Sequence, residues 1–216
     1  MVVVRTLHRR TFAAAAVLAV IAGFVDGIGF VSLGGYFVSF MTGNTTRASV
    51  DLAQADWSGA GLALLLIVSF VVGVVGGTVI PTGRMRSETG VLVLVTGMVA
   101  VAAAAQTIGW PVAGGAALAF AMGAMNTVFA RGGEVGFGIT YMTGALVKLG
   151  QGLVTALRGG SRTAWVRHAV MWASIALGAA VGALVFSFVG AGALWGLALV
   201  MVVLLAIGPA RRWLHV

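Results

Sequence analysis

A carboxylate lies inside the first long apolar stretch of this 216-residue chain. Asp26 is the only charged residue between Arg10 and Arg47. A carboxylate at the centre of a membrane helix costs about 2.5–3.5 kcal/mol to insert and usually faces a bundle interior or a watery cavity. Asp26 could therefore take up and release a proton. The structural alternative is that it pairs with an arginine or caps a half-helix.

A short polar segment follows Asp26 at residues 41–47, with the sequence MTGNTTR. It is too polar for a span that faces lipid. Gly43 allows the chain to break and resume, Thr42 and Asn44 can cap a new helix, and a helix N-terminus offers free amides to an anion. Arg47 and Asp51 are four residues apart, so they could pair on one helix face. Candidate binding residues here are Thr42, Gly43, Asn44 and Arg47.

A second group of candidates stands about 100 residues later. Asn126 lies in another apolar stretch, and Thr143, Gly144 and Lys148 belong to a second Met-Thr-Gly segment. Lys148 is a lone charge in an apolar stretch. The alternatives are a helix–helix hydrogen bond for Asn126 and a Lys148 that extends its ammonium group to the interface from an amphipathic helix.

The elements that position these residues are predicted to be membrane helices. Hydrophobic residues make up 60% of the chain and charged residues only 8%, against about 25% charged in soluble domains. The apolar runs do not alternate as barrel strands do, so helices follow. We expect one all-α membrane domain over residues 1–216, with crossings at 12–34, 58–80, 89–108, 112–130, 166–188 and 190–209.

The chain reads as two repeats, 11–108 and 111–209. Each has an apolar helix with a polar residue, a Met-Thr-Gly segment, a Gly-xxx-Gly helix and a plain apolar helix. The matched positions are Gly23 with Gly123, Asp26 with Asn126, Phe40 with Tyr141, Met41-Thr42-Gly43 with Met142-Thr143-Gly144, and Gly73 and Gly77 with Gly178 and Gly182.

The charges predict how the repeats are oriented. Basic residues in short loops mark the cytoplasmic side of a membrane. If the Met-Thr-Gly segments are re-entrant or half-helical, six crossings place every basic cluster and both termini inside and the second repeat is inverted. If both segments cross, giving eight spans, Arg84, Arg86 and Arg131 move outside. The basic clusters are Arg5–Arg10, Arg84 with Arg86, Arg131, Arg158–Arg167, and Arg211 with Arg212.

Several function classes have no motif in the sequence. There is no cysteine, no metal-ligand spacing and no nucleophile–base pair, so we expect no metal, no cofactor and no enzyme. The net charge of +8 comes from clusters between apolar runs, which indicates cytoplasmic loops and not a nucleic-acid partner.

The stretch 23–44, GFVDGIGFVSLGGYFVSFMTGN, resembles the signature of the YoaK-type family of bacterial membrane proteins, a domain-of-unknown-function family. The resemblance extends over nearly the whole chain through the second Met-Thr-Gly at 142–144. It implies a bacterial inner-membrane protein of about this topology and indicates no substrate.

Inverted repeats with broken helices are typical of secondary transporters, which bind substrate near the bilayer midplane. We therefore expect a small transporter or permease for a small solute or ion, with proton coupling through Asp26. The site would lie at the repeat interface, among Asp26, Asn44, Asn126, Thr143 and Lys148. The alternative is a channel-like pore, which could be a homodimer.

Overall fold

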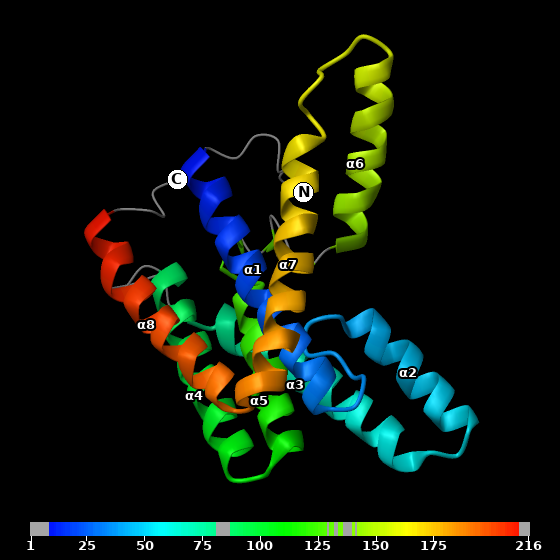
Figure 1. Ribbon diagram of the computed structural model, residues 1–216, viewed down its shortest axis with the longest axis vertical. Coiled ribbons are helices and arrows are strands. Elements are labelled where there is room, and N and C mark those ends of the chain that lie inside the picture. The colour runs from blue at the N-terminus through cyan, green and yellow to red at the C-terminus, as the bar shows by residue number, and fades with distance from the viewer. Residues whose placement is uncertain are drawn as a thin grey trace.

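The computed structural model describes residues 9–80, 87–128, 130–131, 134–135, 140 and 142–211. In this part the chain forms eight helices and one short two-stranded antiparallel ladder (Figure 1). The helices confirm the predicted all-α class. Arg5, Arg84, Arg86, Tyr141 and Arg212 lie outside the described residues. The elements are α1 (Arg9–Ser32), α2 (Met41–Ala53), α3 (Trp57–Thr78), α4 (Ser87–Thr107), α5 (Pro111–Met125), β1 (Ala130–Arg131), β2 (Glu134–Val135), α6 (Met142–Leu157), α7 (Val166–Val189) and α8 (Gly192–Arg211).

The length and composition of several helices are those of a membrane protein. Four helices are long and apolar enough to cross a bilayer, which needs about 20 residues for a core of about 30 Å. Two further apolar helices, Pro111–Met125 and Gly192–Ile207, are shorter. The four long segments are Thr11–Ser32, Trp57–Thr78, Glu88–Thr107 and Val166–Val189.

Helix α5 ends earlier than its apolar run predicts. The sequence suggests a helix to residue 130, whereas α5 ends at Met125. Asn126 donates from Nδ2 to the carbonyl of Met122 at 2.9 Å, and Thr127 donates its hydroxyl to the carbonyl of Ala124 at 2.8 Å. These side chains cap the last turn, and hydropathy alone does not detect such a cap.

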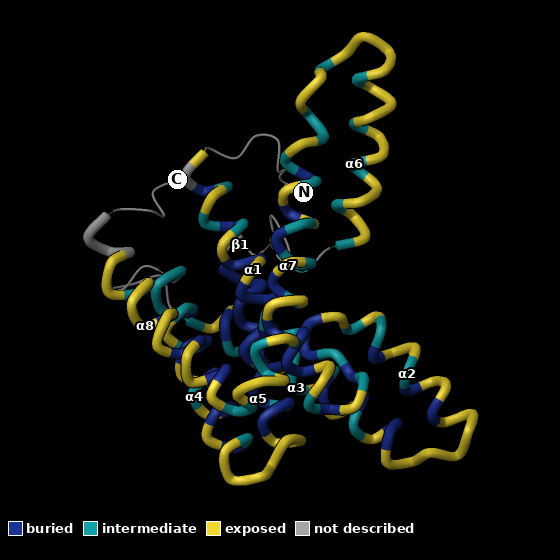
Figure 2. Tube along the Cα trace, in the orientation of Figure 1, coloured by how far each residue is buried: buried dark blue, intermediate teal, exposed yellow. Residues whose placement is uncertain are grey.

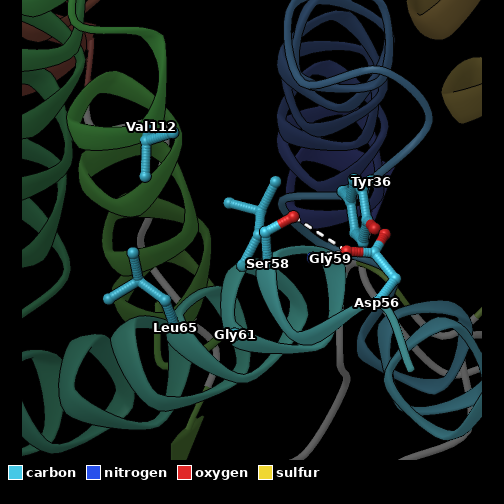
Figure 3. Close-up of a pocket in the computed structure, with 8 residues that line it drawn as sticks. Tyr36, Asp56, Ser58, Gly59, Gly61, Leu65 and Val112 are labelled. Carbon is cyan, nitrogen blue, oxygen red and sulfur yellow. Dashed lines mark hydrogen bonds between the residues drawn. The ribbon is translucent and has the colours of Figure 1, made fainter. Parts of the chain in front are cut away.

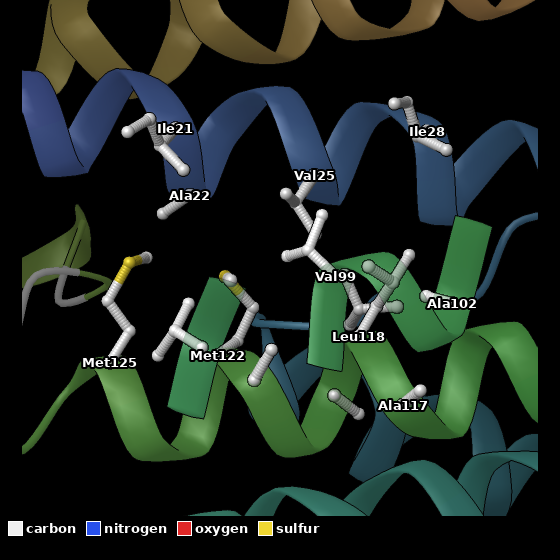
Figure 4. Close-up of a cluster of buried hydrophobic side chains, with 14 of the residues drawn as sticks. Ile21, Ala22, Val25, Ile28, Val99, Ala102, Ala117, Leu118, Met122 and Met125 are labelled. Atoms are coloured by element: carbon white, nitrogen blue, oxygen red, sulfur yellow. The ribbon is translucent and has the colours of Figure 1, made fainter. Parts of the chain in front are cut away.

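The core forms where α1 and α5 run antiparallel at the centre of the bundle (Figure 4). Near one end of the pair Ile21 lies opposite Met125, and toward the other end Ile28 lies near Ala117. All four side chains are buried. Figure 2 shows this buried centre, with exposed residues along the outer helices. Both helices that carry the predicted intramembrane polar residues are therefore central.

Each central helix has its most extensive contact with one outer helix, α1 with α7 and α5 with α3. Glycines line both interfaces at small-xxx-small spacing, which allows close backbone approach. A Cβ at any of these glycines would meet a backbone carbonyl oxygen of the partner helix. The pairs are Gly178 with Val20, Gly182 with Phe24, Gly23 with Ile175, Gly73 with Phe120, Gly77 with Ala124, and Gly123 with Phe70.

The two ends of the bundle differ in charge. In Figure 1 the start of α1, the end of α8 and the α6–α7 turn lie toward the upper end. The α2–α3, α4–α5 and α7–α8 turns lie toward the lower end. The upper segments contain Arg9, Arg158, Arg162 and Arg211, whereas Asp51 and Asp56 stand at the α2–α3 turn.

Candidate functional site

Asp26 holds the loop that leads into α2. Its Oδ1 accepts hydrogen bonds from the backbone N–H groups of Val38 and Ser39, both at 2.9 Å. Because Asp26 stands six residues before Ser32, the end of α1, it lies about 9 Å from that end along the helix axis. The loop 33–40 therefore folds back along α1, and α2 begins at that depth and runs outward (Figure 1).

Asn44 fastens the first turn of α2 to the same loop. Its side chain is fully buried. It accepts from the N–H of Phe37 at 2.9 Å and donates to the carbonyl of Phe37 at 2.6 Å. Gly43 lies beneath the rings of Phe37 and Phe40, where a Cβ would collide. Thr42, in contrast, is exposed. Gly43 and Asn44 therefore attach α2 to the loop, whereas Thr42 presents an exposed hydroxyl.

Tyr36 joins the charged residues of α2. Its hydroxyl donates to Oδ2 of the buried Asp51 at 2.7 Å, and the guanidinium carbon of Arg47 lies 4.5 Å from the centre of its ring. Arg47 and Asp51 form no ion pair within the described part of the chain, so the predicted direct pairing is replaced by contacts of both residues with Tyr36. Burial, and then the Asp51 carboxylate, raise the pKa of the Tyr36 phenol, which therefore stays protonated.

Asn126 has the corresponding place in the second half. The backbone N–H and the hydroxyl of Thr140 lie 3.4 Å and 3.3 Å from its Oδ1. Thr140 aligns with Ser39, since each stands two residues before a Met-Thr-Gly. Both polar residues therefore hold the segment that precedes a short helix, although the contacts of Asn126 are longer than an ordinary hydrogen bond.

The remaining candidates lie on α6, which packs against α7. Thr143 and Gly144 are exposed, and a Cβ at Gly144 would meet no atom within 4 Å. Lys148 is half-buried, close enough to the buried His168 of α7 for its charge to act on the imidazole. The second Met-Thr-Gly segment is therefore more open than the first.

The structure divides the predicted site residues into two groups. Asp26 and Asn44 belong to the junction of α1 and α2, whereas Asn126, Thr143 and Lys148 belong to the segments from the end of α5 through α6. Since α1 and α5 are antiparallel (Figure 4), the two following segments leave from opposite ends of the central pair. Across the described ranges, no group of three or more His, Asp or Glu side chains could hold a metal ion.

This arrangement can be compared with known proteins. The model of a family described as "Protein of unknown function (DUF1275)" matches residues 14–207. The chain belongs to this family. It is also 38% identical, over 200 residues, to a UPF0700 transmembrane protein of Rhizobium meliloti (strain 1021), covering 92% of this chain and 87% of that protein. No solved structure matches.

The DUF1275 match agrees with the predicted resemblance to a membrane family of unknown function and spans both predicted repeats. Three residues of the DUF1275 chain that shape the junctions were not selected from the sequence. These are Tyr36, Ser39 and Thr140, all in the segments just before the Met-Thr-Gly triplets. For Ser39 and Thr140 the available signal was position, because a polar residue two before a predicted helix start is placed to interact with what precedes the helix.

Replacing Tyr36 by phenylalanine should lower the stability of this DUF1275 protein by about 1–3 kcal/mol, since the Asp51 carboxylate loses its hydrogen bond in a buried place. Thermal unfolding in a mild detergent measures the change. Ser187→Ala is a control, because its exposed hydroxyl donates only to the carbonyl of Ala183. Equal stability of both variants would contradict a stabilising role for the Tyr36–Asp51 bond.

Proposed function

We propose that this protein is a small secondary transporter or permease of a bacterial inner membrane, and not an enzyme. The observation that carries the proposal is the pair of folded-back junctions at Asp26 and Asn126. Each is followed by a short helix, and α2 and α6 run outward toward opposite ends of the bundle (Figure 1). Broken segments of this kind, in inverted halves, are where transporters bind substrates and coupling ions.

The glycine contacts support an inverted repeat of 11–108 and 111–209. Gly73 aligns with Gly178, and their carbonyl partners, Phe120 and Val20, are aligned as well. The same holds for Gly77 and Gly182. Each interface therefore repeats the other in corresponding residues, as expected if a two-fold axis relates the halves.

Six crossings with cytoplasmic termini are the proposed topology. Helices α2 and α6 start at the folded-back junctions, partway along the bundle, and run outward (Figure 1), so neither covers a bilayer core of about 30 Å from one side to the other. The arginines of the described termini and of the α6–α7 turn lie at one end, and the acidic α2–α3 turn lies at the other. These features favour six spans over eight.

Cysteine labelling tests this topology without background, since the chain has no cysteine. Arg84→Cys and Arg131→Cys should stay unreactive to an impermeant thiol reagent added outside intact cells. Ile108→Cys, at an exposed position in the α4–α5 turn, should react and serves as the positive control. Labelling of both arginine positions from outside would support eight spans and reject the six-span topology.

A channel-like pore, which could be a homodimer, is the second candidate because of a hydroxyl face on α2. The side chains of Thr42, Thr45, Thr46 and Ser49 are all exposed at helical spacing. The hydroxyls of the last three donate to carbonyls one turn back, so their oxygens can only accept from outside. A polar face near the membrane suits a water-filled path or a contact with a second copy.

Reconstitution separates the two functions. Metabolites that raise the unfolding temperature of the purified protein would be added to proteoliposomes that contain a pH-sensitive dye. A transporter should give saturable, solute-dependent proton movement, which Asp26→Asn abolishes if Asp26 carries the proton. A pore should give single-channel currents in planar bilayers and no accumulation against a gradient, which would reject the transporter.

A further inference from the structure

An open hollow of about 540 Å³ lies beside the first turns of α3 and α5, and Tyr36 of the loop that follows α1 contributes to its lining. Figure 3 shows Leu65 and Val112 on one side, Tyr36 and Asp56 on the other, and Ser58 between them. Leu62, Gly59 and Gly61 complete the lining. The hollow is therefore amphipathic, with one apolar end and one polar end.

Every hydrogen-bond donor of the polar lining side chains is already directed to a carboxylate. The Tyr36 hydroxyl donates to Asp51 at 2.7 Å. The Ser58 hydroxyl and the Gly59 N–H donate to Oδ1 of Asp56 at 2.8 Å and 3.0 Å. The side-chain groups left for a ligand at this end are oxygens that can only accept: Oδ2 of Asp56 and the lone pairs of the two hydroxyls.

Negative charge is concentrated at the same end. The Tyr36 hydroxyl and the Oδ2 atoms of Asp56 and Asp51 all lie within 3 Å of the position that a Cβ of Gly59 would take, so the two carboxylates lie close together beside Gly59. Hydrogen bonds from the Gly59 N–H and then the Ser58 hydroxyl lower the pKa of Asp56, which keeps it ionised. Arg47 lies over the ring of Tyr36 and balances only one of the two charges.

The apolar end can hold a hydrocarbon chain. Leu65 and Val112 are 41% and 46% exposed, and a Cβ at Gly61 would meet no atom within 4 Å. The missing side chain at Gly61 therefore keeps the floor of the hollow open. A hydrocarbon chain lying on Leu62, Leu65 and Val112 would leave water for an apolar surface.

We propose that this hollow binds a small amphiphilic primary amine, with its ammonium group on Asp56, Tyr36 and Ser58 and its hydrocarbon part on Leu62, Leu65 and Val112. An ammonium group has three donors and no acceptor, so it matches a polar end that offers only acceptors. A carboxylate or phosphate would meet two negative charges and no free donor from the lining side chains. This site shares Tyr36 with the loop of the first junction but does not depend on transport, so either proposal can fail alone.

The probe is n-octylammonium, titrated against the full-length protein in phosphatidylcholine nanodiscs by calorimetry, with n-octanol and octanoate as probes of equal chain length. Octylammonium should bind saturably to one site, octanol more weakly, and octanoate not at all. Equal uptake of all three probes would mean simple partition into the disc and would overturn the proposal. Loss of octylammonium binding in discs that contain phosphatidylethanolamine would identify a lipid as the occupant and would overturn it as well.

Two variants locate the site. Asp56→Asn keeps the helix cap, because Asn caps as well as Asp, and should weaken octylammonium binding about two- to fivefold, the range for an exposed ion pair. Gly61→Leu fills the hollow and should weaken binding about tenfold or more, since the loss of two buried CH₂ groups already corresponds to that factor.

Matched controls separate these effects from general damage. Glu88→Gln removes an acidic charge at the start of α4, and Gly97→Leu enlarges another exposed helical glycine with no atom within 4 Å of its Cβ. Both should bind octylammonium as the unmodified protein does. Unchanged affinity in Gly61→Leu, with an unchanged unfolding temperature, would place the amine elsewhere and reject the site.

Discussion

Gly178→Ala should destabilise the protein by about 1–3 kcal/mol or more, the range for overpacking a core. The added Cβ would fall on the carbonyl oxygen of Val20 in α1. The backbone of α1 cannot move locally, unlike the end of a flexible side chain. Helices α1 and α7 must therefore separate along their whole contact. Gly73→Ala should have the same effect at the interface of α3 and α5, where the carbonyl belongs to Phe120.

Two other helical glycines supply the control for this prediction. Gly97 in α4 and Gly196 in α8 are exposed, and a Cβ at either would meet no atom within 4 Å. Alanine there should stabilise its helix by about 0.5–1 kcal/mol, because glycine loses more backbone entropy on folding. Thermal unfolding in detergent should thus shift in opposite directions for the two sets. A similar shift for all four variants would reject close backbone packing at Gly73 and Gly178.

Asp26→Ala should cost about 3 kcal/mol or more, whereas Asp26→Asn should leave stability nearly unchanged. The Oδ1 atom of Asp26 accepts two backbone hydrogen bonds, and each buried N–H group left without an acceptor costs about 1–3 kcal/mol. Alanine would leave the amides of Val38 and Ser39 without an acceptor, and the folded-back loop would lose its attachment. An amide oxygen has two lone pairs and can still accept both bonds.

Thermal unfolding measures this difference, and Asn126→Ala is the comparison. The contacts of Asn126 with Thr140 are 3.3–3.4 Å long, so its loss should have a smaller effect than the loss of Asp26. If Asp26→Asn is as unstable as Asp26→Ala, the charge itself holds the loop. A stable Asp26→Asn protein with undiminished proton-coupled uptake would reject the proton-carrying role of Asp26.

Much of the helical architecture could be predicted from local sequence. The predicted segments 12–34, 58–80 and 166–188 agree within a few residues with α1, α3 and α7, because a run of about 20 apolar residues satisfies its backbone only as a helix in lipid. The Met-Thr-Gly triplets lie at the starts of α2 and α6, but the predicted caps were wrong. Helix α2 begins after Phe40 with no side-chain cap, and Thr42, Gly43 and Asn44 lie inside the helix. The end of α5 was missed because it depends on hydrogen bonds from individual side chains, which a hydropathy window averages away.

The partners of the candidate residues were decided by the tertiary structure. Spacing places Arg47 and Asp51 on one helix face, yet the folded-back loop brings Tyr36 to both of them. Alignment of the halves places Asp26 and Asn126 at matching positions and the charges predict an inverted second half, but the contacts that bring α1 and α5 together as an antiparallel central pair appear only in the structure (Figure 4). Periodicity and composition describe residues that are neighbours along one helix. The sequence by itself therefore determines where the helices form and how long their apolar segments are. Which distant loop meets which side chain depends on how those helices pack, and that information exists only in three dimensions.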